Sequence, residues 1–118
     1  MAAPNLLSTT TVTGKTALAT LSTVTSNVIT NSSGSSTVDK LNNVIISNYS
    51  TSTITANIMI NRSSTIYYIG GNISIPAYST LVLLGKDTSV YLEEGDVVQA
   101  NVSSNSSVSF TASYELMS

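Results

Sequence analysis

The amino-acid sequence predicts an all-β protein: a single antiparallel β-sandwich, of jelly-roll or immunoglobulin-like type, with about eight short strands. Three observations support this prediction. Apolar runs rich in Val, Ile and Leu recur about every 8–12 residues, several with the period-two alternation of a half-buried strand. Polar segments rich in Ser, Asn and Gly separate these runs and are typical of turns. No convincing helical period is found between them.

Length and composition indicate one ordered domain with a neutral surface. The 118 residues, 12.3 kDa, are enough for one modest hydrophobic core. Charged residues make up only 8% of the chain and the net charge is -2, whereas 22 Ser, 17 Thr and 11 Asn supply most of the polarity. The 42% hydrophobic content argues against a disordered linker. A surface with so few charges gains little from self-repulsion, which suggests that neighbouring subunits cover much of it.

Composition also argues against several functions. The chain has no cysteine, so disulfides, thiolate metal sites and cysteine nucleophiles are excluded, and it has no histidine to activate its many serines. The four basic residues form no cluster, so nucleic-acid binding is not expected. No apolar run reaches the roughly 18 residues of a membrane span, and the N-terminus lacks the features of a signal peptide. We therefore expect a protein that is not an enzyme and that has no cofactor or metal site.

The N-terminal segment, residues 1–16, is predicted to be an extended arm, and residues 17–118 the β-sandwich domain. The arm is rich in Ser and Thr and has too little apolar surface to hold itself in place. Two interpretations stay open for it. The arm becomes ordered by adding to the sheet edge of a neighbour, or it is a frayed terminus. Residues 17–19 could form a helical turn, although nothing caps it.

The first half of the domain is predicted to contain strands at 20–30, 38–48 and 53–61, with a loop at 31–36. The third strand has the clearest period of two, and Met59 is its one apolar exception. Its predicted core face consists of Ile54, Ala56, Ile58 and Ile60.

In the second half, Ser63-Ser64 is predicted to turn the chain into a strand at 65–69. Gly70-Gly71-Asn72 is predicted to be a hairpin turn, because glycine accepts the positive φ angles that such turns need. The next short strand ends at Pro76, which cannot donate a ladder hydrogen bond. Residues 80–84 are apolar on both faces and are predicted to form a central strand. The remaining strands are expected at 90–92, 97–102 and 108–116.

Two segments resemble functional motifs. Gly14-Lys15-Thr16 matches the end of a phosphate-binding loop, but Thr9 occupies the position where the motif needs another glycine. Glu93, Glu94 and Asp96 could ligate Ca²⁺ or act as an acid/base pair, yet the run is too short for a calcium loop, and a general acid needs a carboxyl group in an apolar pocket and not on a turn. We expect this segment to be a solvated hairpin turn with ionised carboxylates. Six tyrosines could form a carbohydrate platform, but they are spread over different strands.

Several short motifs, taken together, resemble small virion structural proteins of marine tailed phages. The resemblance covers nearly the whole chain. It rests on Ala3-Pro4-Asn5-Leu6-Leu7, Thr11-Val12-Thr13-Gly14-Lys15-Thr16, Arg62-Ser63-Ser64-Thr65, Ile75-Pro76-Ala77, Leu81, Lys86-Asp87, Tyr91-Leu92-Glu93-Glu94-Gly95-Asp96 and Ser113-Tyr114-Glu115. None of these motifs is catalytic. The resemblance implies a small β-sandwich or jelly-roll module that assembles on the particle.

We therefore expect a phage structural protein located in the virion and assembled in the host cytoplasm. A capsid decoration subunit is the first choice; a neck, tail or fibre-associated protein and a receptor- or carbohydrate-binding module are the alternatives. The expected partners are other virion proteins and further copies of the chain, not nucleic acid or membrane. The predicted interface residues are Pro4, Leu6, Leu7, Val12, Tyr67, Tyr68 and Tyr91.

Overall fold

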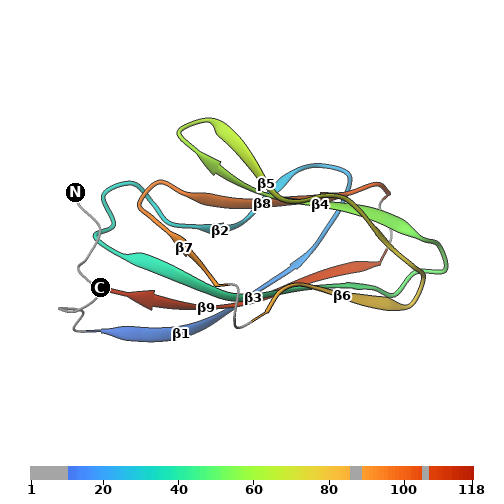
Figure 1. Cartoon of the computed structure of the whole chain (residues 1–118), viewed down its shortest axis with the longest axis horizontal. Helices are drawn as coiled ribbons and strands as arrows, with labels where there is room; N and C mark the ends of the chain where they lie inside the picture. Colours follow the sequence, from blue (N-terminus) through green and yellow to red (C-terminus); the bar gives the residue numbers. More distant parts are fainter. Residues whose placement is uncertain (1–10, 86–88, 105–106) are drawn as a thin grey trace.

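The computed structural model describes residues 11–85, 89–104 and 107–118, and these residues form strands joined by turns. Two antiparallel sheets pack face to face (Figure 1). Sheet A consists of β1 (Val12–Thr20), β9 (Val108–Met117), β3 (Val38–Asn48) and β6 (Ser79–Leu84), with β7 (Val90–Leu92) paired to the other half of β3. Sheet B consists of β2 (Ser26–Thr30), β8 (Val97–Val102), β4 (Ile54–Arg62) and β5 (Thr65–Ile75). The predicted β-sandwich is confirmed, with nine strands in the described residues.

The strand pairing is nested, and this identifies the sandwich as a jelly roll. β1 pairs with β9, β2 with β8, β3 with β6 and β4 with β5, all antiparallel. This is the pattern of one long hairpin that is rolled up, and the β3–β9 and β4–β8 pairs join its layers into two sheets. An immunoglobulin-like sandwich has a different strand order. Of the two types that the sequence left open, the structure has the first.

The core lies between the sheets and follows from strand alternation. Val108, Phe110 and Ala112 are fully buried on β9, two residues apart, as expected for one face of a strand. Ile54, Ala56 and Ile58 cover them from sheet B, which confirms the face predicted for that strand, while Ile60 is partly buried. Met59 is also buried, although it lies outside this cluster.

The predicted hairpin at Gly70-Gly71-Asn72 is wrong, because these residues lie inside β5. β5 has 11 residues and β4 has 9. Two register shifts near Ile58 accommodate the two additional residues of β5 as bulges. A Cβ atom at Gly70 would lie 2.4 Å from Cδ1 of Ile73, so a side chain here would require the end of the Ile73 side chain to shift. The hairpin turn that joins β4 and β5 is Ser63-Ser64, where both residues have positive φ.

Three further expectations are corrected. β6 lies at an edge of sheet A and is not central, and Val82 on its outer side is 61% exposed. Residues 17–19 belong to β1 and do not form a helical turn. Residues 12–16 also belong to β1 and pair with residues 113–117 of β9, so the sheet begins before the domain boundary expected at residue 17. Residues 1–10 of the predicted arm lie outside the described residues.

No helix in the described part of the chain is long and apolar enough to cross a membrane.

Candidate functional site

The acidic turn between β7 and β8 is anchored by Arg62 at the end of β4. Arg62 Nε donates to Oδ1 of Asp96 at 2.7 Å, and its Nη2 donates to Oδ2 at 2.6 Å, which is the bidentate geometry of a strong ion pair. The same Nη2 donates to Glu93 Oε2 at 3.0 Å. The Asp96 side chain is 1% exposed, whereas that of Glu93 is 60% exposed. The expectation of a solvated turn is therefore wrong for Asp96 and right for Glu93.

Hydrogen bonds also tie this turn to the loop between β2 and β3. The Gly95 N–H donates to the Asn31 carbonyl at 2.7 Å, and the Asn31 N–H donates to the Asp96 carbonyl at 2.9 Å. The buried Asn31 amide donates to the carbonyls of Thr37 and Leu92. Glu94 accepts a hydrogen bond from the backbone N–H of Ser36. The three carboxylates thus fasten one corner of the sandwich.

The ionisation of the pair fits this structural role. Burial by itself would raise the pKa of Asp96, but the hydrogen bonds from Arg62 and from the Glu93 N–H, together with the Arg62 charge, lower it below the ordinary value. The hydrogen bond to Asp96 raises the pKa of Arg62. A general acid at neutral pH needs a raised carboxyl pKa, so the ion pair does not supply one.

Asp39 on β3 is the second buried carboxylate among the described residues. It is 2% exposed, and its Oδ1 has no hydrogen-bond partner among the described residues. Burial raises the pKa of Asp39, and the charge of Lys15 opposes this effect. Burial and the neighbouring Asp39 raise the pKa of Tyr114. Lys15 lies opposite Tyr114 on the inner side of β1, so the Gly14-Lys15-Thr16 segment lies in a strand and not in a loop before a helix.

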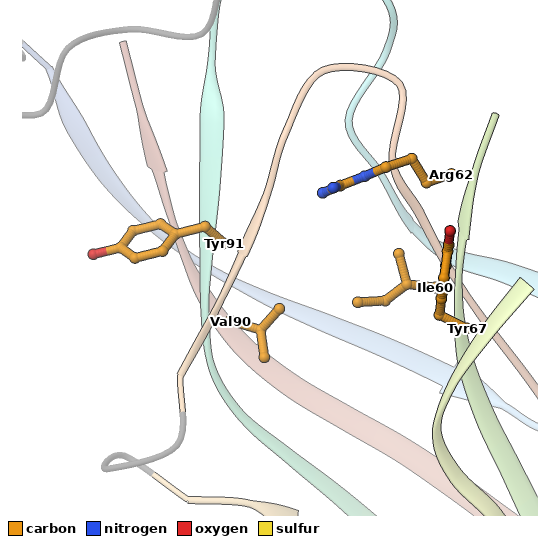
Figure 2. Close-up of a pocket in the computed structure, with 5 residues that line it drawn as sticks. All are labelled: Ile60, Arg62, Tyr67, Val90 and Tyr91. Atoms are coloured by element: carbon orange, nitrogen blue, oxygen red, sulfur yellow. The ribbon is translucent and has the colours of Figure 1, made fainter. Parts of the chain in front are cut away.

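A groove with a volume of about 230 Å³ opens where β4 and β5 face β7. Figure 2 shows Ile60 and Arg62 pointing across this space towards the strand of Val90, with Tyr67 beside them. Tyr91 also lines the groove, although its ring points away from the other lining side chains. The groove is therefore apolar with one guanidinium group, and that group is already bound by Asp96 and Glu93.

The predicted interface tyrosines point in three different directions, although Tyr67 and Tyr91 both line the groove. Tyr67 lies opposite Ile60 and lines the groove, whereas Tyr68 lies opposite Met59 and is 63% exposed on the other side of β5. Tyr91 lies opposite Lys40 on the outer side of sheet A. The structure thus does not bring these three side chains together.

The other predicted interface residues lie at or before the start of sheet A. Val12 is exposed at the start of β1. Pro4, Leu6 and Leu7 lie outside the described residues.

The outer face of sheet A contains a surface that sequence reasoning missed. The strand register aligns one row of side chains across four strands: Leu18, Thr111, Ile45 and Val82. The two ends of this row are highly exposed, Leu18 to 75% and Val82 to 61%. The flanking rows carry only hydroxyl and amide groups: Thr20, Ser109, Ser47 and Thr80 on one side, and Thr16, Ser113 and Asn43 on the other. We call these eleven residues the neutral face.

A shallow depression of about 450 Å³ crosses the part of the neutral face that is formed by β1 and β9. Leu18 therefore lines a hollow that a partner could fill, and Val82 stands at the opposite edge of the same uncharged surface. The local signal in the sequence was the alternation of Ala17, Leu18 and Ala19, in which the large apolar residue is the outward one.

Within the described ranges, no group of three Asp or Glu side chains could hold a metal ion. Comparison with protein-family models and with curated proteins found no match to this sequence.

Proposed function

We propose that this protein is a non-enzymatic structural subunit of a phage particle, and that it decorates the capsid through the neutral face of sheet A. The observation that carries the proposal is that face: eleven uncharged residues across four strands, with Leu18 and Val82 projecting from it. Protein interfaces are depleted of charge at their centres, and this face combines that lack of charge with two highly exposed apolar side chains.

Two further observations support a place in a virion. The jelly-roll topology is shared by many viral capsid domains, although the same topology is also found in lectins and cupins, so it does not define the function alone. The sequence resemblance to small virion proteins of marine tailed phages agrees with it. Among positions within the virion, the capsid surface fits a small, thin module with one broad neutral face, and a neck, tail or fibre position is the alternative.

A receptor- or carbohydrate-binding module is the competing proposal from another class. The groove beside Tyr67 and Arg62 favours it, because an aromatic ring next to a guanidinium group is able to bind a polar ligand. The divergence of Tyr67, Tyr68 and Tyr91 argues against it. Glycan-array binding that is lost on Tyr67→Ala and kept on Tyr68→Ala would favour this module over the capsid role.

Co-sedimentation with phage heads that lack the protein tests the proposed role. We expect the wild-type protein to sediment with the heads. Val82→Lys adds a charge to the neutral face and should weaken binding at least about tenfold, which corresponds to about 1.4 kcal/mol. Val24→Lys is the matched control, because Val24 is 70% exposed in the segment between β1 and β2, away from this face.

Wild-type protein that stays in the supernatant would refute the particle-binding role. Equal losses from Val82→Lys and Val24→Lys would refute the assignment of the neutral face and leave the role itself standing.

A further inference from the structure

The edge strands of the two sheets differ in how well they are protected against pairing with another chain. In the described residues, β2, β5 and β6 lie at edges, and each contains extra residues relative to its neighbour: one in β2, two in β5 and one in β6. β7, which pairs with the other half of β3, has only three residues. Bulges and very short strands are two of the devices by which β-proteins prevent edge-to-edge association, and a charged side chain on the edge, lysine above all, is another.

β1 is the exception. It pairs with β9 over nine successive residues without a register shift, and no described strand pairs with its other side. It contains no proline, and seven of its nine residues are exposed. Its one protecting charge is Lys15, on the inner side of the strand opposite Tyr114, and a partner strand whose register keeps charges away from Lys15 can still pair with β1. A long, regular and nearly uncharged edge is a template for an added strand.

We infer that β1 pairs antiparallel with β1 of a second copy of this chain, so that the two A sheets form one continuous sheet. A twofold axis perpendicular to the sheet keeps the two neutral faces on the same side. In an antiparallel pair, opposite residues point to the same face, so residues of one side of β1 must meet residues of the same side in the second copy. If all nine residues of β1 pair with the nine residues of the second β1, the twofold axis passes through the central residue, Thr16.

This register is self-complementary. It places Leu18 opposite Gly14 of the second copy, and a Cβ atom at Gly14 would meet nothing within 4 Å, so the space above this glycine is open to the 75%-exposed leucine. It places Lys15 opposite Ala17 of the second copy. Moving the axis to residue 15 would put the two Lys15 side chains directly opposite each other, which is destabilising. The fit of the strand to itself is why we choose a second copy over a strand from another protein.

The pairing would also join the two neutral faces. The row of Thr16, Ser113 and Asn43 in one copy would continue through Thr16 of the second copy into the same row there. The inference deepens the proposed structural role by naming one partner, and it does not depend on binding to heads. A chain that binds heads as a monomer would refute the inference and leave the proposed role intact.

The absence of cysteine from the chain allows a direct test by cross-linking. Residues that pair across antiparallel strands have Cα atoms about 4.5–5.5 Å apart, which is within the range of a disulfide. Thr16→Cys should therefore form a disulfide-linked dimer under mild oxidation. Thr20→Cys is the matched control, because the two copies of residue 20 would lie about 26 Å apart, at about 3.3 Å per residue. Both threonines are exposed.

The mass of the cysteine-free protein is measured alongside by light scattering over a dilution series. We expect twice the 12.3 kDa of the chain at high concentration, and at least a tenfold weaker dimer for Leu18→Lys. The melting temperatures of the two proteins should be equal at concentrations where both are monomeric. A monomer at every concentration would overturn the inference. So would a dimer that does not cross-link at residue 16, or one that cross-links equally well at residue 20.

Discussion

Replacing Arg62 with alanine tests whether the acidic turn is a structural anchor. The substitution leaves the 1%-exposed Asp96 carboxylate without its bidentate partner, while the Glu93 N–H still donates to it at 2.8 Å. Removing one partner from a fully buried ion pair costs about 3–5 kcal/mol. The Arg62 side chain is 48% exposed, so solvent screens part of this effect, and we expect a loss of about 2 kcal/mol in the free energy of unfolding.

For a chain of this size, that loss corresponds to a fall of about 8 °C in melting temperature, measured by circular dichroism. Glu93→Gln is the control. Its side chain is 60% exposed, so removing its charge should change the free energy of unfolding by less than about 0.5 kcal/mol. Arg62→Lys should fall between the two, because lysine keeps the charge but cannot form the bidentate contact.

The pH dependence adds a second readout. The pKa of Asp96 is lowered in the folded protein, so the pair contributes stability above the unfolded-state value of about 3.9, and this stability is lost as the pH falls through the folded-state pKa. The difference between wild type and Arg62→Ala should therefore be full at pH 7 and shrink in strong acid. Equal melting temperatures for Arg62→Ala and Glu93→Gln at pH 7 would refute the reasoning.

Three other substitutions test separate parts of the structure by chemical denaturation. Gly70→Ala should cost about 1 kcal/mol, because its methyl group would lie 2.4 Å from Cδ1 of Ile73 and would force the end of that side chain to shift. Gly71→Ala, with its nearest contact at 3.6 Å, should be nearly silent, and equal effects would contradict the close packing at Gly70. Gly95→Val should cost about 1–3 kcal/mol because φ is +89° there, and an unchanged midpoint would show that the turn tolerates a side chain. Asp39→Asn should stabilise the protein by about 1 kcal/mol at pH 7 and not at pH 3. The pKa of Asp39 is raised in the folded protein, so the free energy of unfolding falls as the pH rises from the unfolded-state pKa through the folded-state pKa. A gain that is equal at both pH values would rule out charge burial as the cause.

Local patterns in the sequence were enough to predict most of the fold. The third strand of the jelly roll was predicted with the bounds it has, Val38–Asn48, and the core face of β4 was predicted from its period of two. Gly70-Gly71 failed as a turn signal because two adjacent glycines also suit a bulge, where the backbone must approach its neighbours closely. β6 was taken for a central strand because an exposed Val82 cannot be told from a buried one by its type alone.

The candidate sites were harder to predict because their contacts join distant parts of the chain. Glu93 and Asp96 meet Arg62, which lies about 30 residues earlier in the sequence, and no local pattern shows that pairing. The neutral face depends on the register of four strands from both ends of the chain, so Leu18 and Val82 cannot be recognised as one surface without the sheet. The exposure of Val12, Tyr67 and Tyr68 agrees with an interface role, which stays a prediction.

The copy number of this protein in purified phage particles is the most direct test of the proposed structural role. It can be measured by quantitative mass spectrometry against the major capsid protein. Capsid decoration through the neutral face predicts a fixed ratio to the capsid protein and hundreds of copies per particle. About a dozen copies would instead place the protein at the neck or baseplate, and its absence from the purified particles would contradict the structural role altogether.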